Sequence, residues 1–158
     1  MLSLTAVLAD PKLVRAAAEG LEKITLWTVS GREVTGWLAL PAKTPALTVL
    51  MIHEWWRLND QIKTMAAALA EAGYVVLAAD LYNGLVSENP NTANSLMLNV
   101  EPAAASDTLV SWVQSLKGHP KGNGRIGTIG LVLWWRLVVQ RLARRAGRRD
   151  DRLLRALR

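Results

Sequence analysis

Three apolar strands of a predicted sheet end in residues that could do chemistry, or in a tight turn. The three ends are His53-Glu54, Asp80-Leu81-Tyr82 and Gly130. In an open α/β sheet, ligands bind beyond the carboxyl ends of the strands. We therefore look for a functional site at these three positions.

Glu54 is the strongest candidate among them. It follows the apolar run 47–52 and precedes Trp55 and Trp56. Partial burial there would raise the pKa of a carboxyl group, and a nearby cation would lower it. The simpler interpretation is that Glu54 caps the following turn or pairs with a neighbouring cation. Spacing alone leaves both roles open.

Metal and thiol chemistry are not predicted. The chain contains no cysteine, and its two histidines, His53 and His119, lie in no HxxH or HxH spacing. A histidine metal site needs such spacing or further ligands at fitting positions. We predict a solvated turn at His119, and an Asp80 that closes its strand by accepting backbone N–H bonds. No cofactor is expected.

The elements that would position these residues follow from hydrophobic periodicity and turn signals. Helices are predicted over Lys12–Ala18, from Asn59 or Asp60 to Gly73, and over Ala103–Leu116; strands over Glu22–Ser30, Glu33–Leu40, Leu47–Ile52, Tyr74–Ala79 and Arg125–Gly130; and a polar loop over 83–92. Two hairpin-like strands followed by strand–helix–strand–helix–strand predict an α/β fold. Its mixed, mostly parallel sheet would carry helices on both faces.

Charge divides the chain at Gly130. Residues 1–130 hold 10 of the 19 Lys+Arg and 11 of the 13 Asp+Glu, a net −1, whereas residues 131–158 hold the other 9 against 2, a net +7. All nine basic residues of the second part are arginines. We predict a domain over 1–130 and an Arg-rich amphipathic tail over 131–158. The N-terminus shows no signal-peptide pattern and no apolar run is long enough to span a membrane, so a cytoplasmic protein is expected.

Three segments together resemble a known family. They are MIHEWWRLND, EAGYVVLAADLYNG and HPKGNGRIGTIG, within residues 20 to 130. In type, order and spacing they resemble the dienelactone hydrolase (carboxymethylenebutenolidase-like) family of α/β-hydrolases. The resemblance implies the N-terminal part of an α/β-hydrolase sheet. It also implies hydrolysis of small-molecule lactones or carboxylic esters by a Cys-His-Asp triad, with no cofactor and no obligatory nucleic-acid partner.

The resemblance also assigns residues. It makes Glu54 the carboxylate that regulates ionisation of the nucleophilic thiol. The oxyanion hole would use the backbone N–H groups of Trp55 and Leu133. If Gly130 is the first glycine of the family's Gly-x-Cys-x-Gly-Gly elbow, Val132 occupies the nucleophile position, and an isopropyl group cannot attack a carbonyl.

Further departures from the family pattern also indicate that the catalytic elbow is missing. Trp134 and Trp135 replace the two elbow glycines, and Arg57 stands where the family usually has glycine. The triad Asp and His of family members lie further along than this chain extends. We therefore expect a truncated family member that is inactive as written.

Codon arithmetic offers an origin for the tail. Leu131 to Arg136 encoded as CTG GTG CTN TGG TGG CGN and read one nucleotide later gives Trp-Cys-x-Gly-Gly. With Gly130, this restores the family elbow. We therefore hypothesise that residues 131–158 are an out-of-frame reading of a GC-rich gene, which would also explain nine arginines without a lysine.

The alternative takes the tail at face value. Its arginines at 141, 145, 148, 152 and 155 recur at helical spacing. A basic amphipathic helix of this kind can lie on an anionic membrane or bind nucleic acid. The simplest version is a helix docked on the sheet edge with its arginines in water.

Overall fold

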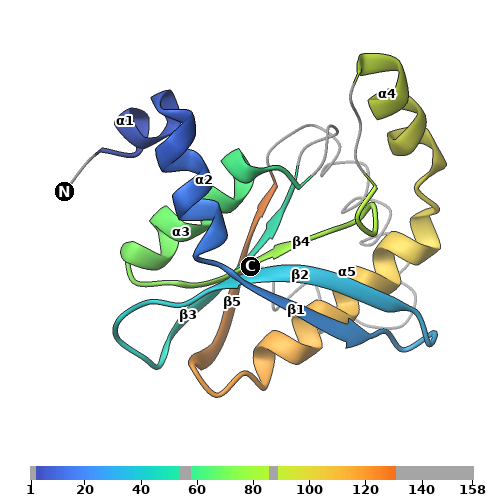
Figure 1. The fold of residues 1–158 in the computed structure, drawn as a ribbon. Helices are drawn as coiled ribbons and strands as arrows, with labels where there is room; N and C mark the ends of the chain where they lie inside the picture. Colours follow the sequence, from blue (N-terminus) through green and yellow to red (C-terminus); the bar gives the residue numbers. More distant parts are fainter. Residues whose placement is uncertain (1–2, 54–57, 86–88, 131–158) are drawn as a thin grey trace.

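The computed structural model describes residues 3–53, 58–85 and 89–130, and within them one five-stranded mixed sheet. Its strands are β1 (Glu22–Trp27), β2 (Glu33–Ala39), β3 (Ala46–Ile52), β4 (Val75–Ala79) and β5 (Gly122–Gly130). Their order is β1-β2-β4-β3-β5 (Figure 1). The pairs β1–β2 and β2–β4 are antiparallel, and β3 is parallel to both β4 and β5. The predicted α/β fold with parallel later strands is confirmed.

The described helices are α1 (Leu4–Ala9), α2 (Pro11–Glu19), α3 (Asp60–Glu71), α4 (Pro90–Asn99) and α5 (Pro102–Lys117). The sequence predicts either Asn59 or Asp60 as the cap of α3. In the structure the cap is Asn59, whose side chain accepts the Ile62 N–H at 3.0 Å. Side-chain oxygens at this position satisfy N–H groups that have no partner within the helix.

The prediction of a loop over 83–92 is wrong in its last part, because α4 begins at Pro90. The Asn89 side chain accepts the Thr92 N–H at 2.9 Å, and Pro90 supplies a backbone angle suited to the first turn. Asn-Pro therefore starts a helix here rather than a turn. Helix α1 was also not predicted; it contains no buried residue, so hydrophobic periodicity gave no signal for it.

Helices cover both faces of the sheet (Figure 1). On one face, Leu109, Trp112 and Leu116 of α5 pack against Leu50 and Leu77. On the other face α3 packs through small side chains, including Ala66 and Ala70, against Met51 and neighbouring strand residues. Each central strand is therefore covered on both sides, which explains the nearly continuous apolar runs of β3 and β4.

The parallel register fixes where the strands end. Ile52 at the end of β3 pairs with Ala79 at the end of β4 and with Gly130 at the end of β5. The chain therefore leaves all three strands at one edge of the sheet, which we call the carboxyl edge. Among the described residues, no helix is both long and apolar enough to cross a bilayer.

Candidate functional site at the carboxyl edge

The residues with predicted roles border the described structure rather than lie within it. Glu54 and Trp55 fall in the gap after His53, and Val132 and Leu133 follow Gly130; all four lie outside the described residues. The structure does place the points from which these segments start, because Ile52 and Gly130 are paired neighbours. The Arg-rich tail over 131–158 also lies outside the described residues.

A buried polar group occupies the described part of this edge. It consists of His53, Asp80 and Tyr82, which we call the edge cluster, and each residue is about 5% exposed, at 6%, 5% and 5%. The Leu81 N–H donates to Nε2 of His53 at 3.1 Å, and this nitrogen lies 3.8 Å from Oδ1 of Asp80. The Tyr82 ring meets the His53 ring edge-on at 4.7 Å between centroids. Two strand ends and one loop thus meet in this cluster.

Asp80 organises the loop that follows β4. Its Oδ1 accepts the Tyr82 N–H at 2.9 Å, and its Oδ2 accepts the Gly84 N–H at 2.7 Å. Asn83 and Gly84 have positive φ values of 52° and 83°, which asparagine and glycine tolerate better than other residues. The prediction that Asp80 closes its strand by accepting backbone N–H groups is confirmed.

Tyr82 keeps its phenol neutral at ordinary pH. Burial raises the pKa of Tyr82 to about 12, and the negative charge of Asp80 adds to the effect. The group can therefore donate or accept a hydrogen bond but does not act as a phenolate base near neutrality. Within the described ranges, no three His, Asp or Glu side chains converge in a way that could hold a metal ion.

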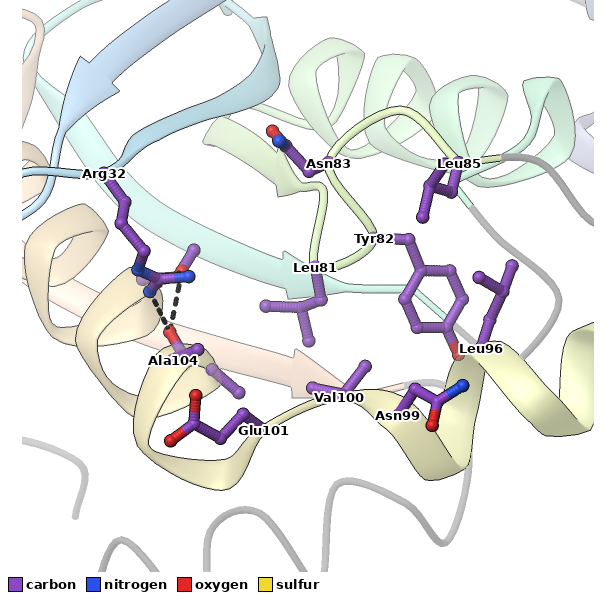
Figure 2. A pocket seen from close by; sticks show the side chains of 12 residues that line it. Arg32, Leu81, Tyr82, Asn83, Leu85, Leu96, Asn99, Val100, Glu101 and Ala104 are labelled. Atoms are coloured by element: carbon purple, nitrogen blue, oxygen red, sulfur yellow. Dashed lines mark hydrogen bonds between the residues drawn. The ribbon is translucent and has the colours of Figure 1, made fainter.

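A cavity of about 250 Å³ adjoins the edge cluster, between the loop after β4, the end of α4 and the first turns of α5. Figure 2 shows Arg32 and Glu101 at one side of it and Tyr82 and Leu96 at the other, with Leu81 between them. Its walls are largely apolar. The cavity could hold a small apolar group at the rim of the sheet.

The Arg32 guanidinium is already engaged by α5. Its Nη2 donates to the Ala104 carbonyl at 2.6 Å and lies 3.4 Å from Oδ2 of Asp107, which also accepts the Ser30 hydroxyl. We call Ser30, Arg32 and Asp107 the hairpin clasp, because they join the β1–β2 turn to α5. Hydrogen bonds from the hydroxyls of Ser30 and Thr28 lower the pKa of Asp107. Arg32 is therefore held against α5 by a hydrogen bond and an ion pair.

From the sequence, His53 is a strand-end residue without metal-ligand spacing, and Arg32 has no predicted role. The structure shows His53 as an acceptor for a backbone N–H and Arg32 as part of a cavity wall. The sequence carries a signal for the burial of His53, because this residue directly follows the buried strand β3. It carries no local signal for the position of Arg32.

These features define an α/β fold whose carboxyl edge carries a preorganised polar cluster, and the relatives identify its family. The model of the dienelactone hydrolase family matches residues 34–148, so the chain belongs to this family. The matched range begins and ends later than the stretch 20–130 on which the sequence resemblance was based, and it continues beyond Gly130. The resemblance is confirmed at the level of the family.

Individual relatives agree. A protein of Saccharolobus solfataricus assigned as a carboxymethylenebutenolidase is 39% identical over 79 residues, covering 49% of this chain and 30% of its own length. The hydrolase fragment YghX of Escherichia coli K12 is 36% identical over 100 residues, covering 59% of this chain and 79% of the fragment. The solved structure m3DLH shares the fold, with a TM-score of 0.65, 22% identity and coverage of 80% of this chain and 55% of that one. The matched part of this chain thus spans less than a third of the length of the Saccharolobus solfataricus protein.

Proposed function

We propose that this chain carries the strand framework of a lactone or carboxylic ester hydrolase but does not itself catalyse hydrolysis. The observation that carries this proposal is that the chain contains no cysteine, and the family resemblance assigns the nucleophile position to Val132. In the family reaction, a thiolate attacks the carbonyl, two backbone N–H groups hold the oxyanion, and water releases the acyl group. The first of these steps has no nucleophile here.

The geometry of the sheet supports the assignment of position 132. Gly130 is the last residue of β5 and pairs with Ile52, directly before His53. A side chain two residues past Gly130 would therefore start from the same edge as the segment that begins with Glu54. This shared starting edge supports the proposal, because the family resemblance implies that the nucleophile and the oxyanion segment lie close together.

Hydrolysis of p-nitrophenyl acetate and of a dienelactone tests the proposal. We expect the purified chain and its Glu54→Ala variant to show the same rate as buffer. A positive control is the same chain with residues 131–135 replaced by Trp-Cys-Ser-Gly-Gly, which restores the elbow and is expected to form an acyl adduct visible by intact-protein mass spectrometry. Hydrolysis by the unaltered chain that Glu54→Ala abolishes would overturn the proposal, as would an acyl adduct on it.

The origin of residues 131–158 is a separate part of the proposal. We infer that they are an out-of-frame reading, because a one-nucleotide shift recovers Gly-Trp-Cys-x-Gly-Gly from the plausible codons. The family model matches residues 34–148 of the chain as translated, and the codons test this origin directly. Sequencing codons 125–140 is expected to show GTG at Val132 and CGN at Arg136. A GTT codon at Val132 or an AGA codon at Arg136 would remove the hypothesis.

A second candidate function rests on the net +7 charge of residues 131–158. If these residues act as translated, they bind an anionic surface, either an anionic membrane or nucleic acid. The chain should then bind anionic vesicles or duplex DNA with an affinity that falls steeply as salt rises. Removing residues 131–158 should abolish that binding. Binding that survives the deletion, or that is insensitive to salt, would contradict this function.

A further inference from the structure

His53 serves as a hydrogen-bond acceptor at the carboxyl edge. Its Nε2 lies 3.1 Å from the Leu81 nitrogen, whose N–H points at it. A ring nitrogen that accepts a hydrogen bond carries no proton, so the neutral ring holds its proton on Nδ1. The side chain is 2% exposed, and water therefore competes little for this position.

This bond continues the strand pairing where the backbone ladder stops. The parallel ladder between β3 and β4 ends at the pair Ile52–Ala79. The next residue on β3 is His53, and its ring reaches Leu81, two residues beyond Ala79. A side chain thus holds the two strand ends together for one step past the sheet.

Protonation would change the partner of His53. In the part of the chain that the structure describes, its neighbours include Asp80, whose Oδ1 is 3.8 Å from Nε2, and Tyr82, whose ring lies edge-on. A protonated Nε2 could no longer accept from Leu81, and Asp80 would be the neighbouring acceptor. The Leu81 N–H would then lose its partner, whereas the Tyr82 and Gly84 N–H groups would keep Asp80.

We propose that neutral His53 is a positioning residue, which fixes the end of β3, and with it the point where the chain leaves the sheet, to the loop after β4. Only the catalytic purpose of this positioning rests on the proposed function. By family resemblance, Trp55, two residues after His53, supplies an N–H group to the oxyanion hole. The link itself belongs to described residues. It is testable whether or not the chain hydrolyses esters.

The unaltered chain provides the first test, because it holds two histidines that should show opposite tautomers. His119 accepts the Lys121 N–H at Nδ1, at 3.3 Å, and so should carry its proton on Nε2. Long-range ¹H–¹⁵N spectra of the full chain at pH 8 are expected to show His53 as the Nδ1–H form and His119 as the Nε2–H form. A proton on Nε2 of His53 at this pH would overturn the proposal.

Two substitutions of unequal reach provide the second test. His53→Gln can place an acceptor oxygen near the original Nε2, whereas the shorter His53→Asn cannot, and His119→Gln is the matched control. We expect Leu81 amide exchange roughly tenfold faster or more in His53→Asn, close to normal in His53→Gln and unchanged in His119→Gln. Equal Leu81 protection in all three variants would overturn the link.

A third measurement separates positioning from mere stabilisation. In the unaltered chain, the amide signals of Leu81 and Trp55 should shift together with the protonation of His53, while those of Tyr82 and Gly84 shift less. The Trp55 amide signal should also differ between His53→Asn and His53→Gln. A Trp55 signal that ignores both the titration and the substitution would show that His53 does not position this segment. Ester hydrolysis, measured on the same samples, tests the proposed function independently.

Discussion

The edge cluster and the hairpin clasp both fasten a loop of the same sheet, but they use opposite chemistry. In the edge cluster, His53 and Asp80 accept backbone N–H groups from the loop after β4, and both are almost fully buried. In the hairpin clasp, Arg32 and Asp107 pair mainly through side chains that are 42% and 19% exposed. One arrangement fixes the backbone, and the other fixes the position of a turn against a helix.

The difference shows which region is built for precision. A buried acceptor that serves backbone donors cannot be exchanged for water, so its loss leaves N–H groups unpaired. An exposed ion pair can exchange its partner for solvent at small cost. The precise region lies at the carboxyl edge, and the tolerant region lies at the β1–β2 turn.

Removal of Asp80 should have the largest effect. Asp80→Ala deprives the Tyr82 and Gly84 N–H groups of their acceptor in a buried loop, and we expect a loss of about 3 kcal/mol in the free energy of unfolding. Asp80→Asn keeps one acceptor oxygen and should lose less. Urea unfolding followed by circular dichroism measures both. An Asp80→Ala loss below that of Asp80→Asn would contradict the role given to the two oxygens.

Alkaline pH should weaken the edge cluster next. The pKa of Tyr82 is about 12 in the folded chain and 10.0 in the unfolded chain. The unfolded chain therefore releases this proton at lower pH. Stability from this group is complete below pH 10 and is lost as pH rises through 12, by about 2 kcal/mol at pH 12.

Two tyrosine variants isolate this effect. The stability of Tyr82→Phe relative to the unaltered chain should rise between pH 10 and pH 12, because phenylalanine has no proton to lose. Tyr74, which is 37% exposed against 5% for Tyr82, supplies the control Tyr74→Phe. If the stability difference between Tyr82→Phe and the unaltered chain does not change over this pH interval, burial does not raise the pKa of Tyr82.

Much of the edge cluster could be predicted because its parts are close to strand ends. The apolar runs of β3 and β4 predicted that His53 and Asp80 lie at one edge, and the polar residues after them predicted a loop from residue 83 onward. The pairing of His53 with Leu81 could not be predicted, because it depends on the relative register of two strands. Hydrophobic pattern predicts which residues are buried but not which residues of two parallel strands are neighbours.

The hairpin clasp had no comparable signal. Ser30 and Asp107 are 77 residues apart and meet only because α5 lies across the sheet below the β1–β2 turn. Each is an ordinary polar residue of an exposed turn or helix when viewed locally. The roles of Glu54 and Val132 came from family resemblance alone, and they stay predictions because both residues lie outside the described ranges.

The hairpin clasp itself should give the smallest effect. A double-mutant cycle with Arg32→Gln and Asp107→Asn is expected to yield a coupling energy below about 1 kcal/mol, since both side chains are reached by water. Ser30→Ala should raise the pKa of Asp107 toward its ordinary value, because the Ser30 hydroxyl is the main cause of its lowering. The stability that this carboxylate contributes is present above its unfolded pKa and is lost as pH falls through the folded value. Nuclear magnetic resonance titration of Asp107 measures the shift. A coupling energy as large as the loss expected for Asp80→Ala would remove the distinction between a precise edge and a tolerant turn.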